Sequence, residues 1–522
     1  MAANDGRVGL IIILSVGMLL GSFLVFFFFT AIVNFIIDTQ LPLNEGSVTY
    51  DMWRKPPVTP IMRIYIYNVT NADEFLNDKQ KPIINEIGPY TYSESWEKVN
   101  LVRNDNGTIT FNQRKIFTFR PELSAGSEDD LVVVPNIPLL SATSKSASAP
   151  KFLRITINFM TNLKKLKPFV AVTVGELLWG YDDPLMQLAK EMAPDTKLPF
   201  ERFGLFFDRN GTSADNITVY TGADDINKLG EVSRFNGLDK YSFYKTDECN
   251  SFGGSDGTIF PPHLNKNSKI YIFDKNLCRK LPFTFQKEVT SYDDIKAYRF
   301  SPPKNVFDEV SKNPENDCYC TAPPCAPQGT FNISACSFDT PVLLSFPHFY
   351  LGNPEIRNAV VGVSPPDPQK HEIYIDMKPE MGVPLRAVVR LQINLAVTHA
   401  NDIDAVALFP DIIFPIMWFE DGIDRLPTDI VSLVKLATEV PTVARCFLLY
   451  ILFFCGLFFL VVSVFCLIRS SNRQEIMVLP DSAFYGNKDD STKKQKPPMT
   501  DFTAEKPIDT KDNPAFITDE SK

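Results

Sequence analysis

Two long stretches of this chain are apolar and contain no charged side chain. They run from Val8 to Ile37 and from Cys446 to Ile468, and they are 30 and 23 residues long. An α-helix rises about 1.5 Å per residue, so either stretch can cross the roughly 30 Å hydrocarbon core of a bilayer. We therefore predict one transmembrane helix at 8–37 and a second at 446–468.

Between these stretches the main signal is an alternation of apolar and polar residues. Valine, leucine and isoleucine occupy almost every second position of 389–397, and similar patterns run through Ile109 to Arg120 and Glu372 to Met377. A period of two is typical of half-buried strands in an antiparallel sheet. The segment 38–445 is therefore expected to be mainly β.

Two segments with helical spacing interrupt this alternation. In the first, Lys151 to Leu166, apolar residues recur at steps of three and four, and Pro168 follows as a stop signal. The second is a shorter helix predicted at 184–191. We expect one α+β domain that is mainly β and has a helical insertion. The apolar positions of the first helix are Phe152, Ile155, Phe159 and Leu163.

The distribution of glycosylation sequons indicates the topology. The first apolar run is about twice as long as the apolar core of a signal peptide, so we interpret it as an uncleaved anchor. All five N-x-S/T sequons lie between the two runs, which places 38–445 in a lumenal or extracellular space. Residues 1–7 and the tail 469–522 are then cytosolic, and the polar tail is expected to be disordered. The predicted glycosylation sites are Asn68, Asn106, Asn210, Asn216 and Asn332.

Cysteine placement agrees with an oxidising compartment. Six of the nine cysteines lie within 249–336, and the number is even. A zinc site is an alternative, but paired C-x-x-C knuckles are missing, so disulfides are favoured and no metal is predicted. The other three lie in the second apolar run, where Cys466, near its cytosolic end, is a candidate for palmitoylation. The six cysteines of the loop are Cys249, Cys278, Cys318, Cys320, Cys325 and Cys336.

Composition and charge exclude several classes of function. Apolar residues make up 44% of the chain, which is too high for a disordered protein. The net charge is −10, of which about −9 lies in 38–468, so nucleic acid is not expected as a partner. Only four histidines occur, so neither catalysis by imidazole groups nor a metal site built from several histidines is expected. An anionic ligand would need a local basic patch.

One short motif suggests an enzyme. Gly253 to Gly257 reads G-G-S-D-G, which matches the G-x-S-x-G pattern of serine hydrolases with Ser255 as the nucleophile. A nucleophile elbow needs a buried strand before the serine and a helix after it, and the flanking sequence predicts neither. We expect a chance turn in a glycine-rich loop, no catalytic residues and no cofactor.

Several longer motifs, taken together, identify a family. They are I-Y-I-Y-N-V-T-N at 64–71, E-I-G-P-Y-T-Y at 86–92, L-L-W-G-Y-D-D-P at 177–184, F-P-P at 260–262, N-D-C-Y-C at 316–320 and F-P-H-F at 346–349. In this order, and with both anchors, the chain resembles the class B scavenger receptors. That family includes fatty acid translocase, the high-density lipoprotein receptor, the lysosomal integral membrane protein and the sensory neuron membrane proteins. Some of these residues have simple structural explanations: Trp179 and Tyr181 as packing aromatics, and His348 as a buried, hydrogen-bonded residue.

The resemblance implies a fold and a disulfide pattern. It implies an antiparallel, barrel-like β shell around an apolar cavity, with a helical cap at about 151–199 and two transmembrane helices in a hairpin topology. It also pairs Cys249 with Cys318, Cys278 with Cys336 and Cys320 with Cys325. Spacing alone leaves fifteen connectivities for six cysteines.

The resemblance also implies non-enzymatic lipid binding at the cap. Lys164, Lys165 and Lys167 stand among apolar residues that include Phe169, a combination that suits a carboxylate or phospholipid head and its chain. The simpler alternative is a solvated helix end whose lysines favour the C-terminal dipole. Expected partners are fatty acids, sterols or other long-chain lipids, lipoproteins or lipid carriers, and the membrane. Assembly into a homo-oligomer is a further possibility.

Three functions are therefore carried forward. The first is a plasma-membrane scavenger receptor that binds lipids or lipoproteins and delivers hydrophobic ligand through an internal cavity toward the membrane. The second is an endolysosomal membrane receptor or lipid transporter that binds a partner enzyme. The third is a serine hydrolase.

Overall fold

The computed structural model describes residues 2–192, 202–292 and 294–476. The chain divides into two compact units, one of residues 18–454 and one that contains residues 2–17 and 455–476. The predicted tail therefore lies mostly outside the described residues, and so do positions 193–199 of the predicted cap.

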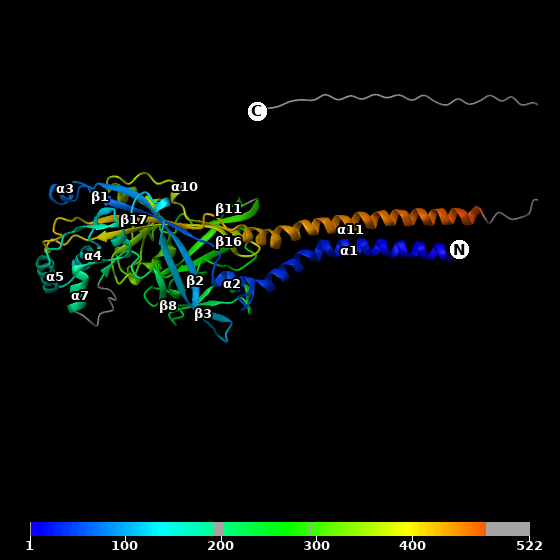
Figure 1. Ribbon diagram of the computed structural model, residues 1–522, viewed down its shortest axis with the longest axis horizontal. Coiled ribbons are helices and arrows are strands. Elements are labelled where there is room, and N and C mark those ends of the chain that lie inside the picture. Colours follow the sequence, from blue (N-terminus) through cyan, green and yellow to red (C-terminus); the bar gives the residue numbers. More distant parts are fainter. Residues whose placement is uncertain (1, 193–201, 293, 477–522) are drawn as a thin grey trace, which may run out of the picture. The chain divides into compact units, whose positions relative to one another are not determined.

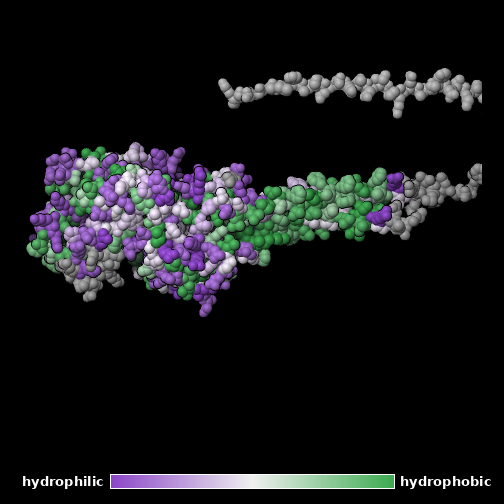
Figure 2. All heavy atoms as spheres, in the orientation of Figure 1, coloured by the Kyte–Doolittle hydropathy of each residue, from purple (hydrophilic) through white to green (hydrophobic). Residues whose placement is uncertain are grey.

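Two long helices contain the predicted membrane spans. They are α1 (Ala2–Gln40) and α11 (Thr428–Ile476), and each has a stretch long and apolar enough to cross a membrane. In the smaller unit, the Ser15 hydroxyl donates to the Gly456 carbonyl over 2.8 Å. In the larger unit, the Ser22 hydroxyl donates to the Leu449 carbonyl over 3.3 Å, and α1 and α11 lie side by side (Figure 1). Figure 2 shows apolar side chains over both helices.

Helix α11 begins well before the predicted span. Its first turns are amphipathic rather than uniformly apolar, and Val431 and Val434 pack into a cluster with Ile295 and Leu385 of the sheet domain. A tertiary contact therefore extends the helix beyond the apolar run, because burial of one face stabilises residues that the hydropathy pattern leaves out.

A large antiparallel sheet forms most of the larger unit. It has thirteen strands in the order β10-β11-β12-β15-β16-β17-β1-β2-β3-β8-β9, with β13 and β14 attached through β16. The strands predicted from alternation are present as β3, β15 and β16. The bounds are β1 Ile61–Val69, β2 Ile84–Arg103, β3 Thr108–Phe119, β8 Gly211–Tyr220, β9 Val232–Phe235, β10 Lys269–Asp274, β11 Arg279–Ser291, β12 Ile295–Ser301, β13 Thr330–Asn332, β14 Val342–Ser345, β15 Tyr374–Lys378, β16 Val383–Val397 and β17 Ile412–Gly422.

The two outermost strands, β9 and β10, are joined through one residue, Ser255. It forms β-bridges with Glu231 on one side and with Ile272 on the other. The Ser255 N–H donates to the Tyr271 carbonyl, and the Phe273 N–H donates to the Ser255 carbonyl, both over 2.9 Å. These bridges nearly close the sheet into a barrel, as predicted.

Shorter elements cover the sheet at the predicted cap. The first predicted helix is α5, which ends three residues earlier than expected, and the second is α7; two short strand pairs, β4–β5 and β6–β7, lie among them. The bounds are β4 Leu131–Pro135, α4 Ile137–Ser146, α5 Lys151–Leu163, β5 Phe169–Thr173, α6 Val174–Trp179, β6 Tyr181–Asp182, α7 Pro184–Met192 and β7 Arg202–Phe203. Elsewhere the short helices are α2 Val48–Arg54, α3 Ala72–Asp78, α8 Asp247–Asn250, α9 Pro354–Asn358 and α10 Pro368–His371.

Candidate functional site

Helix α5 exposes its apolar face to solvent. Phe152 is 73% exposed and Phe159 is 63% exposed, although both are aromatic residues in a helix that packs on a folded domain. At 100° per residue these positions lie on one side of the helix, so they form a continuous stripe. The α5 stripe, as we call it, consists of Phe152, Ile155, Phe159 and Leu163.

The face of α5 next to the stripe holds the helix to the domain through polar contacts. Arg154 lies 3.2 Å from the Asp402 carboxylate. The Asn162 side-chain amide donates to the Asp404 carboxylate over 2.8 Å, and that of Asn158 does so over 3.2 Å. These two hydrogen bonds lower the pKa of the Asp404 carboxyl below its ordinary value. These polar contacts, together with Ile157 and the buried Thr161, attach the helix to the domain and leave the α5 stripe exposed.

The sequence did not predict the two acidic residues that hold α5 to the domain. Asp402 and Asp404 lie in the loop after β16, more than 240 residues from their partners, as the Asn158 contact illustrates. Nothing local in a T-H-A-N-D-I-D segment indicates that it receives a helix. A pairing of asparagine and arginine on α5 with this loop is visible only in three dimensions.

The three predicted lysines follow the α5 stripe. Lys164 is the C-cap of α5, Lys165 has a left-handed backbone with φ of 51°, and Lys167 precedes the buried Pro168. All three side chains are exposed, and none forms an ion pair with a described residue. The structure therefore brings the predicted basic patch to the end of the apolar stripe.

Phe169 does not belong with these lysines. It is only 8% exposed, and its ring packs against Phe75 and Phe409 at centroid distances of 5.9 and 5.6 Å. Because Pro168 ends the loop and Phe169 starts β5, the strand turns this side chain into the core. Phe169 is thus a core residue of the cap, and its part in ligand binding stays a prediction.

Ser255 is a structural residue at the barrel seam. It is 3% exposed, and its hydroxyl donates to the Ile259 carbonyl and accepts from the Gly257 N–H. A nucleophile needs an adjacent base and access to substrate. Within the described chain, Ser255 forms no hydrogen bond with a histidine. The G-x-S-x-G match is explained by the seam: a side chain on Gly254 would lie 2.9 Å from the Tyr271 carbonyl.

Three disulfides join the six loop cysteines. They are Cys249–Cys318, Cys278–Cys336 and Cys320–Cys325, the pairs that the family resemblance implies. Within the described chain the free cysteines are those of the second apolar run, where Cys466 is partly exposed. Its palmitoylation remains a prediction.

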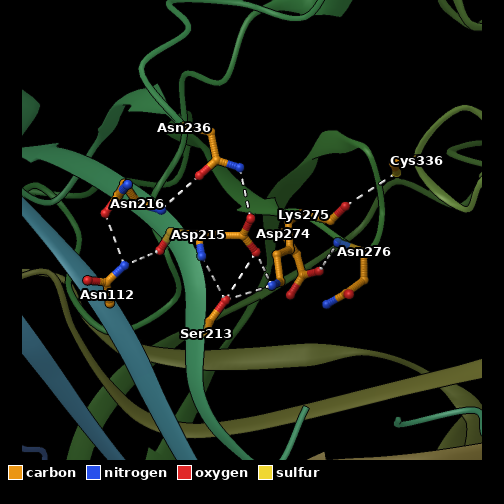
Figure 3. A network of polar contacts seen from close by, with 9 residues as sticks. All are labelled: Asn112, Ser213, Asp215, Asn216, Asn236, Asp274, Lys275, Asn276 and Cys336. Carbon is orange, nitrogen blue, oxygen red and sulfur yellow. Dashed lines mark hydrogen bonds and ion pairs between the residues drawn. The ribbon is translucent and has the colours of Figure 1, made fainter. Parts of the chain in front are cut away.

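The five sequon asparagines lie on the larger unit. Asn68, in β1, is partly exposed and accepts from the Val133 N–H, and the other four are exposed. Asn216, in β8, stands in a polar network with Asn112 and Asn236 (Figure 3). The Asn236 amide donates to the Asp215 carboxylate, which also accepts from Lys275 of the β10–β11 turn. These positions are compatible with glycans, whose attachment remains a prediction.

A buried polar layer lies between the sheet and the segment 346–372. His348 is 3% exposed, as expected for a structural residue, and its Nε2 lies 2.7 Å from the Glu86 carboxylate. The His348 N–H and the Tyr67 hydroxyl both donate to the Gln392 carbonyl oxygen, over 2.8 and 3.0 Å. The His371 ring stacks on His348 with centroids 4.2 Å apart.

The charges in this layer shift the pKa of two groups. Burial alone would raise the pKa of the Glu86 carboxyl, but the hydrogen bond and charge of His348 outweigh it and the pKa is lowered. Burial lowers the pKa of His371 to about 4, assisted by the neighbouring His348. His371 Nδ1 accepts from the Asp367 N–H, which also requires that nitrogen to be unprotonated.

Two cavities of the larger unit lie away from α5. One, of about 290 Å³, is lined by residues of the disulfide-rich segment. The other, of about 490 Å³, lies between α1 and α11 and is lined by apolar residues such as Phe26 and Phe453. Within the described residues no group of three or more His, Cys, Asp or Glu could hold a metal ion.

Comparisons with known proteins agree on one family. Residues 9–467 match the family model described as the CD36 family. Scavenger receptor class B member 1 of Mus musculus is 33% identical over 436 residues, which cover 83% of each chain. Lysosome membrane protein 2 of Homo sapiens is 33% identical over 402 residues, which cover 76% of this chain and 81% of the relative. Similarity alone thus does not separate a scavenger receptor from a lysosomal membrane protein.

Proposed function

The chain belongs to the CD36 family, and from this premise we propose that it is a cell-surface scavenger receptor for lipids or lipoproteins. It captures them at the α5 stripe and delivers hydrophobic ligand through the interior of the sheet domain toward the membrane. It is a two-pass membrane protein, and its termini face the cytosol. The relatives carry receptor and lysosome membrane names, which supports a receptor rather than an enzyme.

The observation that carries the proposal is the orientation of α5. A helix that only covered the domain would bury its apolar side, because each large apolar side chain gains about 1.5–3 kcal/mol on burial. Here Phe152 and Phe159 stay exposed while Asn158 and Asn162 face the domain. A contiguous apolar patch on a water-exposed surface is typical of a binding site. Lysines at its end add attraction for anionic head groups, within a Debye length of about 8 Å at physiological salt.

The test uses the full chain in nanodiscs and measures capture of lipoprotein particles and of vesicles that contain anionic lipid. The double substitution Phe152→Ser with Phe159→Ser is expected to weaken capture at least about tenfold, because two large apolar contacts are lost. Leu238→Ser is the matched control, since Leu238 is 55% exposed but lies outside the cap. Capture at the wild-type level by the double variant would contradict the proposal.

The lysines are tested separately by changing Lys164, Lys165 and Lys167 to Gln. Capture of anionic vesicles should weaken, and more strongly at low salt, whereas capture of neutral vesicles should change little. An equal effect on both kinds of vesicle would assign the lysines to folding of the cap rather than to ligands. Identification of lipids that copurify with the full chain tests delivery through the interior.

The second candidate is an endolysosomal membrane receptor or lipid transporter that binds a partner enzyme. It is favoured by the 33% identity to Lysosome membrane protein 2, which equals that to the scavenger receptor. Steady-state residence separates the two: surface labelling of intact cells supports the first, and retention in lysosomes with a copurifying soluble enzyme supports the second.

A further inference from the structure

Two carboxyl groups meet on the buried face of the sheet, beside the first residues of β1. Met62 of β1 pairs with Asp421 of β17 on one side and with Tyr92 of β2 on the other. Glu94 follows two residues after Tyr92, and its N–H donates to the Pro60 carbonyl over 2.9 Å. Residues paired across strands, and residues two apart within a strand, share a face. Both carboxyl groups therefore project on the side of the buried Met62.

This position lies close to both membrane helices along the chain. Strand β1 begins at Ile61, shortly after α1 and α2, and β17 ends at Gly422, shortly before α11 begins at Thr428. A force between the two carboxyl groups therefore acts where the barrel joins its anchors.

The Glu94 carboxylate is enclosed, and only one of its oxygens has a donor. The residue is 2% exposed. Its Oε2 accepts from the Trp96 indole N–H over 2.5 Å and lies 3.9 Å from the Lys115 ammonium. Its Oε1 is buried, and no N–H or O–H group of the described residues donates to it. Buried polar atoms in folded proteins are almost always paired, so this oxygen lacks a donor.

Asp421 has the same deficit and lies next to it. Its Oδ1 is buried and also lacks a donor among the described residues, although its carboxyl group lies within hydrogen-bonding reach of Glu94. Two ionised carboxylates can only accept hydrogen bonds. A hydrogen bond between the two groups therefore requires a proton on one of them.

The surrounding charges favour that proton. Burial and the charge of Glu94 raise the pKa of the Asp421 carboxyl well above its ordinary value. The charge of Lys115 on β3 lowers this pKa, whereas the charge of Asp274 on β10 and the hydrogen bond with Glu94 raise it. Lys115 also lies 4.4 Å from the Trp96 ring centroid, so one cation serves two carboxyl groups and an indole ring.

We propose that Glu94 and Asp421 form a proton-binding site, in which the two carboxyl groups hold one proton between them at neutral pH. Asp421 carries the proton and donates it to Glu94, which keeps its negative charge beside Lys115. Water reaches the site, because Asp421 is partly exposed and the Lys115 side chain is 31% exposed, so the proton exchanges with solvent. Its loss leaves two adjacent carboxylates, which repel each other across the start of β1 and loosen the barrel beside its anchors. The site does not depend on the α5 stripe.

The first experiment measures thermal unfolding of the full chain in nanodiscs between about pH 5 and 9. The folded chain holds this proton at pH values where the unfolded chain has lost it, so stability should fall as the pH rises through the raised pKa of Asp421. Asp421→Asn has the shape of the protonated group and an N–H donor for Glu94, so it should remove this fall. Its melting temperature should exceed that of wild type by about 2 °C or more at the alkaline end, and the difference should shrink at the acid end.

Asp105→Asn is the control for these curves, since Asp105 is an exposed aspartate in the β2–β3 turn. Its melting temperature should run parallel to that of wild type over the whole pH range. Parallel curves for Asp421→Asn and wild type would overturn the proposal.

A second experiment observes the proton through the infrared C=O stretching band of a protonated carboxyl, in ether-linked lipids that have no carbonyl group of their own. At neutral pH, wild type should show more of this band than Asp421→Asn. Glu94→Gln keeps the test valid if Asp421→Asn fails to fold: it removes the neighbouring negative charge, so the Asp421 band should disappear at a lower pH than in wild type. Equal bands in wild type and Asp421→Asn, or an unchanged titration in Glu94→Gln, would each contradict the shared proton.

Discussion

Helix α5 and the layer beneath the segment 346–372 both reverse the usual placement of side chains, and in opposite ways. On α5, apolar residues such as Phe159 face solvent. Under 346–372, polar residues are buried, and Gln392 is fully so. The buried groups have partners: Arg390 donates to the Gln369 and Glu372 carbonyls and pairs with a carboxylate of the sheet.

The difference lies in whether the misplaced groups are satisfied. His348 contacts two residues of the sheet: its Nε2 lies 2.7 Å from the Glu86 carboxylate, and its N–H donates to the Gln392 carbonyl oxygen. These contacts hold the covering segment on the sheet. Phe152 and Phe159, by contrast, remain largely exposed on α5. Buried polar groups that contact one another thus indicate a structural role. Large apolar side chains that stay exposed indicate a surface that binds another molecule.

The largest contrast is expected between two phenylalanines of the cap. Phe169→Ala should destabilise the protein by about 3–5 kcal/mol, because it opens a cavity among Phe75, Phe409 and Phe414. Phe159→Ala should change stability by less than about 0.5 kcal/mol, as at other exposed positions. Thermal unfolding of the full chain in nanodiscs measures both. A destabilising Phe159→Ala would show that the α5 stripe is part of the core.

A smaller loss of stability is expected when the buried polar layer is broken. Glu86→Ala leaves the His348 ring buried without its carboxylate, 2.7 Å away in the native protein, and should cost about 2–4 kcal/mol. The same unfolding assay measures it, with Glu122→Ala as the control for an exposed glutamate. An unchanged melting temperature would mean that the contact between Glu86 and His348 does not stabilise the fold.

The smallest effect expected is a pH dependence from His371. Its pKa is lowered to about 4 from an ordinary 6.5, so the unfolded chain binds more protons between these values. Stability should therefore be complete above pH 6.5 and fall as the pH drops toward 4, by about 1–2 kcal/mol after allowance for solvent screening.

The His371 contribution is isolated by comparison with His371→Gln. Because this variant cannot be protonated at that position, its melting temperature should fall less steeply than that of wild type between pH 6.5 and 4. Parallel curves for the two proteins would assign the acid sensitivity to other groups, such as Glu86, whose lowered pKa acts in the same direction at lower pH.

The sequence by itself determined the features that depend on local order along the chain. Apolar runs place both membrane helices, a period of two predicts β3, β15 and β16, and a period of three to four predicts α5. Long motifs carry the family and, with it, the disulfide pairs. These features depend on periodicity, length and residue type, which need no knowledge of distant contacts.

Only the tertiary structure decided which way the elements face. Periodicity shows that α5 is amphipathic, but not that its polar side meets Asp404, so that Phe159 is left outside and Phe169, ten positions on, is inside. It was likewise the barrel seam that turned Ser255 from a candidate nucleophile into a bridge between β9 and β10. The physical reason is the same in each case: contacts between residues far apart in sequence fix a side chain's surroundings, and a local pattern contains no information about its distant partner.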